Sequence, residues 1–134
     1  GGMSMISKRK DKDMDTIIGK GTVIDGDIRS DGSVHVNGSV NGDLYVQGNV
    51  VIGRGASVVG DIRANNLYIS GTVEGSVYCS GFLRMFSEGV LKGDASAHSF
   101  AVDEGAFFDG KISMTQEERT RDDNAVDQEE QPST

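Results

Sequence analysis

Four carboxylates recur at one position of a repeating pattern and are the first candidates for chemistry: Asp27, Asp43, Asp61 and Asp94, each of which follows a glycine. Carboxylates stacked in a row would attract a cation, but the G-G-x-G-x-D repeat of calcium-binding solenoids is absent. Two arginines stand two residues after members of this series and would relieve the repulsion between like charges. We therefore predict a solvated edge and no metal site.

The histidines, the cysteine and the glycine-rich loops are weaker candidates. His35 and His98 lie in different repeats, and Cys79 shares the parity of the apolar residues, so the three do not form a zinc site. The segments 18–22 and 52–56 contain G-x-G, which also occurs in phosphate-binding loops. They lack the lysine and hydroxyl of a Walker loop, and no helix is predicted after them. We expect no nucleotide and no other cofactor.

The elements that position these residues follow from the alternation in VHVNGSVNGDLYVQGNVVI, residues 34–52. One parity is aliphatic or glycine and the other is almost wholly polar, which is the pattern of a half-buried β-strand. The pattern holds for far longer than the usual strand of about 5–6 residues. It therefore predicts a chain that bends at its glycines and keeps one parity inside.

The same pattern repeats along the chain. One glycine marks each repeat, at an interval of 15 to 18 residues: Gly26, Gly42, Gly60, Gly75, Gly93 and Gly110. The positions two before and two after every one of these glycines are apolar. Such self-similarity is typical of a solenoid, and the strand parity makes it a β-solenoid. The sequence thus predicts an all-β, parallel β-helix of about six coils.

Charge and composition divide the 134 residues into three parts, with the β-helix at 17–114. This rod carries 11 acidic and 7 basic residues, which argues against nucleic acid as a partner. The segments 1–16 and 115–134 are predicted to be disordered, the second because it is acidic and almost free of aliphatic side chains. A single cysteine and the lack of a long apolar run predict a protein that is neither membrane-spanning nor secreted.

The two ends of such a rod expose unpaired backbone groups and an apolar cross-section. Neither flanking segment has the composition of a hydrophobic cap. Aromatic residues of the last coil either close the core themselves or meet another subunit, and we predict the second. The predicted polymerisation contacts are Phe107, Phe108 and Ile112 at one end, and Ile17, Ile18, Ile24 and Ile28 at the other.

Three stretches resemble the bactofilin family of bacterial cytoskeletal proteins: TIIGKGTVIDGDIRSDGSVHVNGSVNGDL (16–44), VIGRGASVVGDIRANNLYISGTVEGSV (51–77) and VDEGAFFDGKISM (102–114). The resemblance implies a right-handed, three-sided β-helix that forms homopolymeric filaments without nucleotide. It further implies a cytoplasmic scaffold at the inner face of the cytoplasmic membrane, where the filaments recruit cell-wall synthases or hydrolases and influence cell shape.

The family often carries a short membrane-targeting stretch at the N-terminus, and the matching residues here are Met3, Met5, Ile6, Lys8, Arg9 and Lys10. The apolar members would enter the headgroup boundary while each basic member contributes about 1 kcal/mol near anionic lipid. Inner-membrane lipid is therefore a possible partner. The alternative is an ordinary disordered start, and the aspartates that follow count against an anchor.

Two other functions are compatible with a β-solenoid. The segment 52–58 is similar to the repeat of hexapeptide acyltransferases, which need a catalytic base, usually histidine, in a cleft between subunits. A strict six-residue period is missing here, and alternation by two dominates. A carbohydrate-binding solenoid would carry a stripe of aromatic or carboxylate side chains on one face. Of Tyr45, Tyr68 and Tyr78, only the first and last share a repeat position. We therefore predict a scaffold and not an enzyme.

Overall fold

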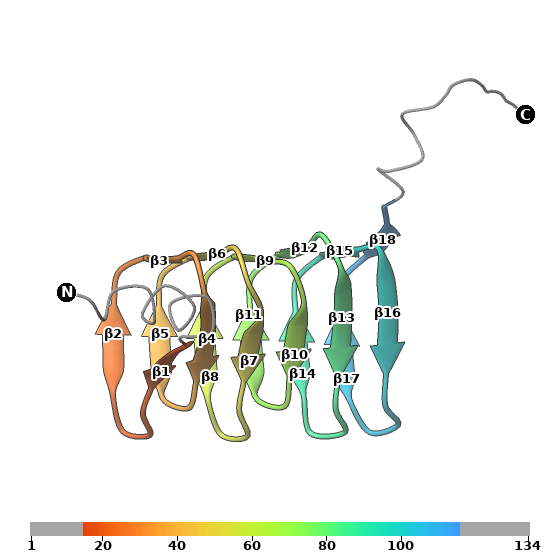
Figure 1. Cartoon of the computed structure of the whole chain (residues 1–134). Coiled ribbons are helices and arrows are strands. Elements are labelled where there is room, and N and C mark those ends of the chain that lie inside the picture. Colours follow the sequence, from red (N-terminus) through yellow and green to blue (C-terminus); the bar gives the residue numbers. More distant parts are fainter. Residues whose placement is uncertain (1–14, 116–134) are drawn as a thin grey trace, which may run out of the picture.

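A computed structural model describes residues 15–115, and every regular element within that range is a β-strand (Figure 1). The strands form three parallel sheets of six strands each, which we call faces A, B and C. The chain passes through one strand of each face in turn, so three consecutive strands make one coil and the rod has six coils. The predicted all-β, three-sided β-helix is confirmed.

The strands are short and recur in a fixed order. Face A contains β1 (Asp15–Ile18), β4 (Ser33–Val36), β7 (Val50–Ile52), β10 (Leu67–Ile69), β13 (Phe82–Met85) and β16 (Ser99–Val102). Face B contains β2 (Val23–Asp25), β5 (Ser39–Asn41), β8 (Ser57–Val59), β11 (Thr72–Glu74), β14 (Val90–Lys92) and β17 (Phe107–Asp109). Face C contains β3 (Ile28–Ser30), β6 (Leu44–Val46), β9 (Ile62–Ala64), β12 (Val77–Cys79), β15 (Ala95–Ala97) and β18 (Ile112–Met114). The first strand begins before residue 17, where the rod was predicted to start.

The core is built from columns of side chains that point inward at the same position of successive coils. On face B, for example, Val40 pairs in register with Val58, which pairs in turn with Val73, and all three are fully buried. Fully burying an aliphatic side chain of this size contributes about 1.5–3 kcal/mol. None of the buried side chains between residues 15 and 115 is polar or charged. A slip of one residue would turn these columns outward, so the core fixes the register of the coils.

The repeat glycines form a spine at the corner between faces B and C. A methyl group at Gly60 would collide with the carbonyl oxygen of Gly42 in the coil before, and the same relation holds for the next glycines of the series. Gly26 starts the spine, and no atom of residues 15–115 lies within 4 Å of a methyl group placed on it. Glycine is needed in the later coils because one backbone crosses closely over the next.

The corner between faces A and B has two lengths. Longer turns are closed by backbone hydrogen bonds, such as Thr22 N–H to the Gly19 carbonyl at 3.0 Å and Ala56 N–H to the Gly53 carbonyl at 3.0 Å. These are the two G-x-G segments, and the structure confirms them as corner loops. Two further turns of this kind, at 86–89 and 103–106, were not predicted because they lack the G-x-G spelling.

Candidate polymerisation surfaces

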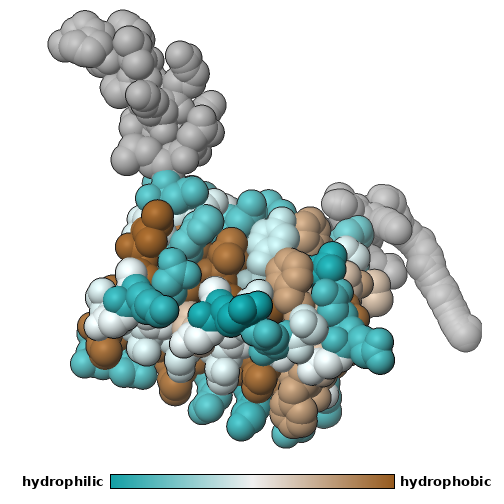
Figure 2. Space-filling view, turned by 90° about the horizontal axis from the view of Figure 1, so that it is seen from below, coloured by the Kyte–Doolittle hydropathy of each residue, from teal (hydrophilic) through white to brown (hydrophobic). Residues whose placement is uncertain are grey.

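The flank of the rod carries no single apolar surface on the side seen from below. Figure 2 shows hydrophobic and hydrophilic side chains interspersed there. The inward columns behave differently, because their middle members are buried and their end members are not. On face B, Leu91 is fully buried, whereas Phe108 in the next coil and Ile24 in the first coil are half-buried. Within residues 15–115, the two ends of the rod are therefore the places where core side chains lack a covering layer.

The C-terminal end surface consists of the inward side chains of the last coil. Ile112 pairs with Ala95 and Met114 with Ala97, both of which are buried, yet Ile112 is 48% exposed and Met114 is 63% exposed. Val102 continues the buried column of face A and is 48% exposed. The sequence prediction named Ile112 and Phe108 but omitted Val102 and Met114 from the contact. The parity of their columns was the signal that would have included them.

The N-terminal end surface is smaller. Ile18 is 4% exposed and belongs to the core, while Ile24 and Ile28 pack against the core and remain half-buried. The predicted group thus comes together at this end with one exception. Ile17 pairs with His35 in an outward column and is 65% exposed, so it lies on the flank of face A.

Phe107 is the corresponding exception at the other end. It pairs with Val90 in an outward column of face B and is 51% exposed. The neighbouring Phe108 points inward, because successive side chains of a strand point to opposite sides. The structure therefore places Phe108 and Ile112 in one end surface and Phe107 beside it on the flank.

The aspartate series has a role that the sequence did not reveal. The Asp27 carboxylate accepts the Asp43 backbone N–H at 2.8 Å, and Asp43 accepts the Asp61 N–H at 2.8 Å. Asp61 and Asp94 do the same for Ser76 and Lys111, at 3.0 and 3.1 Å. Each carboxylate therefore fastens its own coil to the next one. No group of three or more potential metal ligands occurs in the described part of the chain.

Face C carries alternating arginine and tyrosine side chains. The Arg29 guanidinium lies 4.6 Å from the centre of the Tyr45 ring, and Arg63 lies 4.3 Å from that of Tyr78. The Tyr45 hydroxyl donates to Asp43 Oδ2 at 3.2 Å. This hydrogen bond and the negative charge of Asp43 raise the pKa of Tyr45. These stacked arginine and tyrosine side chains therefore connect successive coils on the outside of face C.

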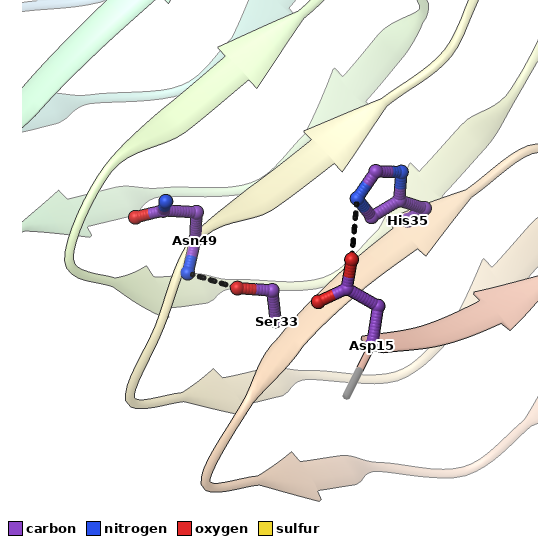
Figure 3. Close-up of polar contacts among 4 residues, drawn as sticks. All are labelled: Asp15, Ser33, His35 and Asn49. Carbon is purple, nitrogen blue, oxygen red and sulfur yellow. Dashed lines mark hydrogen bonds and ion pairs between the residues drawn. The ribbon is translucent and has the colours of Figure 1, made fainter. Parts of the chain in front are cut away.

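Ser33, His35 and Asp15 lie near one another on face A at the N-terminal end (Figure 3). These are the residue types of a hydrolase catalytic triad, but they do not make the hydrogen bonds of such a triad. Asp15 Oδ2 lies 3.5 Å from His35 Nε2 and links β1 to β4. Ser33 Oγ accepts the backbone N–H of Asn49 at 3.1 Å and is directed toward the next coil. A nucleophile needs its base within hydrogen-bond reach, and Ser33 makes its contact elsewhere. These four residues join coils.

Cys79 occupies the core position that its parity predicted. It is 4% exposed, and burial raises the pKa of its thiol to about 12. A thiol with such a pKa stays protonated at neutral pH and is a poor nucleophile.

Within residues 15–115, no helix has the length and apolar character that crossing a bilayer requires. The predicted membrane-targeting residues of 3–10 and the segment 116–134 lie outside the described residues.

A stack of parallel coils with open backbone edges and uncovered core side chains at both ends defines a β-solenoid suited to self-assembly. The model of the bactofilin family, described as polymer-forming cytoskeletal, matches residues 16–113. The chain belongs to the bactofilin family, as the resemblance of its sequence implied. It is a cytoskeletal, polymer-forming structural protein.

Individual relatives agree with this assignment. The chain is 30% identical to bactofilin BacO of Myxococcus xanthus over 104 residues, which cover 78% of this chain and 82% of BacO. It is 26% identical to bactofilin BacP of the same organism over 99 residues, which cover 74% of this chain but only 41% of BacP. The structure of a Thermus thermophilus bactofilin, solved by cryo-EM as double helical filaments, superposes on this chain with a TM-score of 0.70 at 25% sequence identity. The matched region covers 75% of this chain and 99% of the Thermus chain.

Proposed function

We propose that this protein assembles end to end, without nucleotide, into filaments at the inner face of the cytoplasmic membrane. The filaments act as a scaffold that recruits cell-wall synthases or hydrolases and thereby influences cell shape. The observation that supports assembly is the exposure of Val102, Ile112 and Met114, whose counterparts in the coil before are buried. The cellular part of the proposal rests on membership of the family.

End-to-end contact satisfies two needs of the rod at once. The outermost strands of each face have one edge without a partner, and a second rod pairs with that edge. The contact also covers inward side chains, and complete burial of each contributes about 1.5–3 kcal/mol before the cost of association. Both gains come from surface burial and backbone pairing. Neither requires the energy of nucleotide hydrolysis, so purified protein is expected to form threads in plain buffer.

The decisive variant is Ile112→Arg, because it places a charge without a partner in the contact. The matched control is Ser113→Arg, which adds the same charge to the outward side of the same strand. We expect electron microscopy to show threads for the wild type and the control but none for Ile112→Arg. Unchanged threads of Ile112→Arg would contradict the proposal.

The size of the remaining particle reports which ends meet. If like ends join, Ile112→Arg breaks one of two kinds of contact and leaves dimers in analytical ultracentrifugation. If unlike ends join, the same variant leaves monomers, because every contact contains one C-terminal end. We expect replacement of the chromosomal copy by Ile112→Arg and deletion of the gene to change cell shape in the same way.

Membrane attachment is tested separately from assembly. A few basic residues at about 1 kcal/mol each bind a monomer weakly, whereas a filament presents many copies together. Wild-type filaments should sediment with liposomes that contain anionic lipid, and filaments without residues 3–10 should stay in the supernatant. Equal sedimentation of the two would refute the role of residues 3–10. Ile112→Arg provides the control for multivalency, because it should bind the same liposomes weakly.

A further inference from the structure

We infer that Asn37 is a site of spontaneous deamidation in the folded rod, and that the isoaspartate formed there loosens the first coil. The chain has two Asn-Gly pairs, Asn37-Gly38 and Asn41-Gly42, which have the same chemistry but different hydrogen bonds. The modification does not depend on assembly. Only its effect on filaments rests on the proposed end-to-end contact.

Deamidation of an Asn-Gly pair is an intramolecular reaction. The backbone nitrogen of the glycine attacks the side-chain carbonyl carbon of the asparagine, and the new C–N bond closes a succinimide ring. The bond to the amide nitrogen breaks, and that nitrogen leaves as ammonia with the proton of the backbone nitrogen. Water then adds to either ring carbonyl and opens the ring to aspartate or isoaspartate. Glycine favours the attack because it has no side chain in the way.

Asn37 has the freedom that this reaction requires. It follows β4 at the corner between faces A and B and is exposed to solvent. Within residues 15–115, its side-chain amide makes no hydrogen bond and the Gly38 N–H has no acceptor. The amide oxygen of Asn37 lies over Gly53 of the next coil, which has no Cβ to enclose it. The amide is therefore free to turn toward the Gly38 nitrogen, and this nitrogen is free to attack.

Asn41 is held in place by two hydrogen bonds. Its Nδ2 donates to Asp25 Oδ1 in the coil before at 2.8 Å, which fixes the amide. The Gly42 N–H donates to the Val59 carbonyl in the next coil at 3.0 Å, which occupies the attacking nitrogen. Both bonds have to break before the ring can close, and each stabilises the unreacted state. The fold therefore protects one Asn-Gly pair and leaves the other reactive.

The corner around Gly38 has no room for a longer main chain. A methyl group on Gly38 would collide with the carbonyl oxygen of Thr22 in the first coil. On one side of this point, Asn37 N–H donates to the Ile18 carbonyl at 2.8 Å. On the other side, Ser39 N–H donates to the Thr22 carbonyl at 2.9 Å. Isoaspartate adds one carbon to the main chain between these two donors, so both bonds cannot keep their register.

The first coil, β1 to β3, carries the N-terminal end surface, where Ile24 and Ile28 pack against the core. Loss of its hydrogen bonds to the second coil displaces these side chains. In the proposed filament, a subunit with isoaspartate at position 37 therefore loses its N-terminal contact. Aspartate, the other product, keeps the length of the main chain and should be tolerated at this exposed position.

The test compares the two Asn-Gly pairs in one sample. Purified full-length protein is incubated at mildly alkaline pH, and peptide mapping by mass spectrometry follows the conversion of each amide to the acid. In the folded protein, Asn37 should react at least about tenfold faster than Asn41, which corresponds to about 1.4 kcal/mol in the barrier. In urea the two rates should be similar. Similar rates in the folded protein, a faster reaction at Asn41 or no reaction at Asn37 would overturn the inference.

The effect on the first coil is tested with Asn37→Gln, which keeps an amide at the exposed position but closes the corresponding ring much more slowly. After incubation, the wild type should lose threads in electron micrographs in proportion to the isoaspartate at position 37, and Asn37→Gln should keep them. Wild-type threads that persist despite this isoaspartate would refute the loosening of the coil. Absence of threads in fresh wild-type protein would refute the proposed function, and the peptide map still decides whether Asn37 is modified.

Discussion

Replacing Gly60 by alanine tests how closely the coils are stacked. Its backbone φ is 154°, a value that residues with a side chain rarely adopt. A Cβ atom there would also approach the backbone of Gly42 to well under 3.0 Å, and a backbone atom cannot move aside as a flexible side chain can. Alanine at this position therefore strains the corner and forces two coils apart.

The expected loss has two parts. Holding a residue with a side chain in a rare backbone conformation costs about 1–3 kcal/mol. Separating the coils weakens the hydrogen bonds beside the corner, such as Gly42 N–H to the Val59 carbonyl at 3.0 Å, and an unsatisfied backbone group costs about 1–3 kcal/mol. The sum is about 2–6 kcal/mol, which is a large share of the roughly 5–15 kcal/mol of a stable domain.

Two other glycines separate these parts. Gly55 has a φ of 85° but no atom within 4 Å of a methyl group, so Gly55→Ala should cost only the conformational term of about 1–2 kcal/mol. Gly19 has neither constraint, since its nearest atom is Thr22 Oγ1 at 3.9 Å, and Gly19→Ala should be close to neutral. Urea denaturation followed by circular dichroism measures all three at one protein concentration, because assembly shifts apparent stability. A Gly60→Ala variant as stable as Gly55→Ala would refute the stacking argument.

The remaining predictions concern titratable groups of the coils. Asp43→Asn keeps an acceptor for the Asp61 N–H but removes the charge beside Tyr45, so the tyrosinate absorbance should appear at lower pH with little change in stability. Asp43→Ala removes the acceptor as well and should cost about 1 kcal/mol in urea. Because folding raises the pKa of Tyr45, its contribution to stability is complete below the unfolded pKa and is lost as the pH rises through the folded value. Cys79 should react with a thiol reagent at pH 8 only after unfolding, and rapid labelling of the native protein would contradict its burial.

The sequence was most informative where the fold repeats. Strand alternation and the glycine spacing predicted the coils and their inward columns, because each coil has to satisfy the same packing requirement as its neighbours. The end contacts stay a prediction. Alternation in β1 and β17 turns the predicted Ile17 and Phe107 outward, whereas Val102 and Met114 continue inward columns at the C-terminal end.

The aspartate series shows a different limit. Its spacing was visible in the sequence and was interpreted as a solvated edge. The bond from the Asp43 carboxylate to the Asp61 backbone depends on the height of one coil and the angle of the corner. Neither quantity can be read from residue types. The edge-to-face contact between the Tyr68 and Phe82 rings was hidden for the same reason, because the two residues are separated in sequence and meet only when β10 and β13 stack.

Gly26 is the first member of the glycine spine. Within residues 15–115, a methyl group on Gly26 meets no atom within 4 Å, because β1 to β3 form the first coil of this range. A neighbouring molecule that prolonged the same stack would bring its own backbone to that spot and strike the methyl group. A neighbour turned the other way would not continue the spine. Alanine at Gly26 carries the conformational cost of a φ of 139° in every molecule, so a loss of fibres beyond the loss of stability would indicate that successive molecules face the same direction.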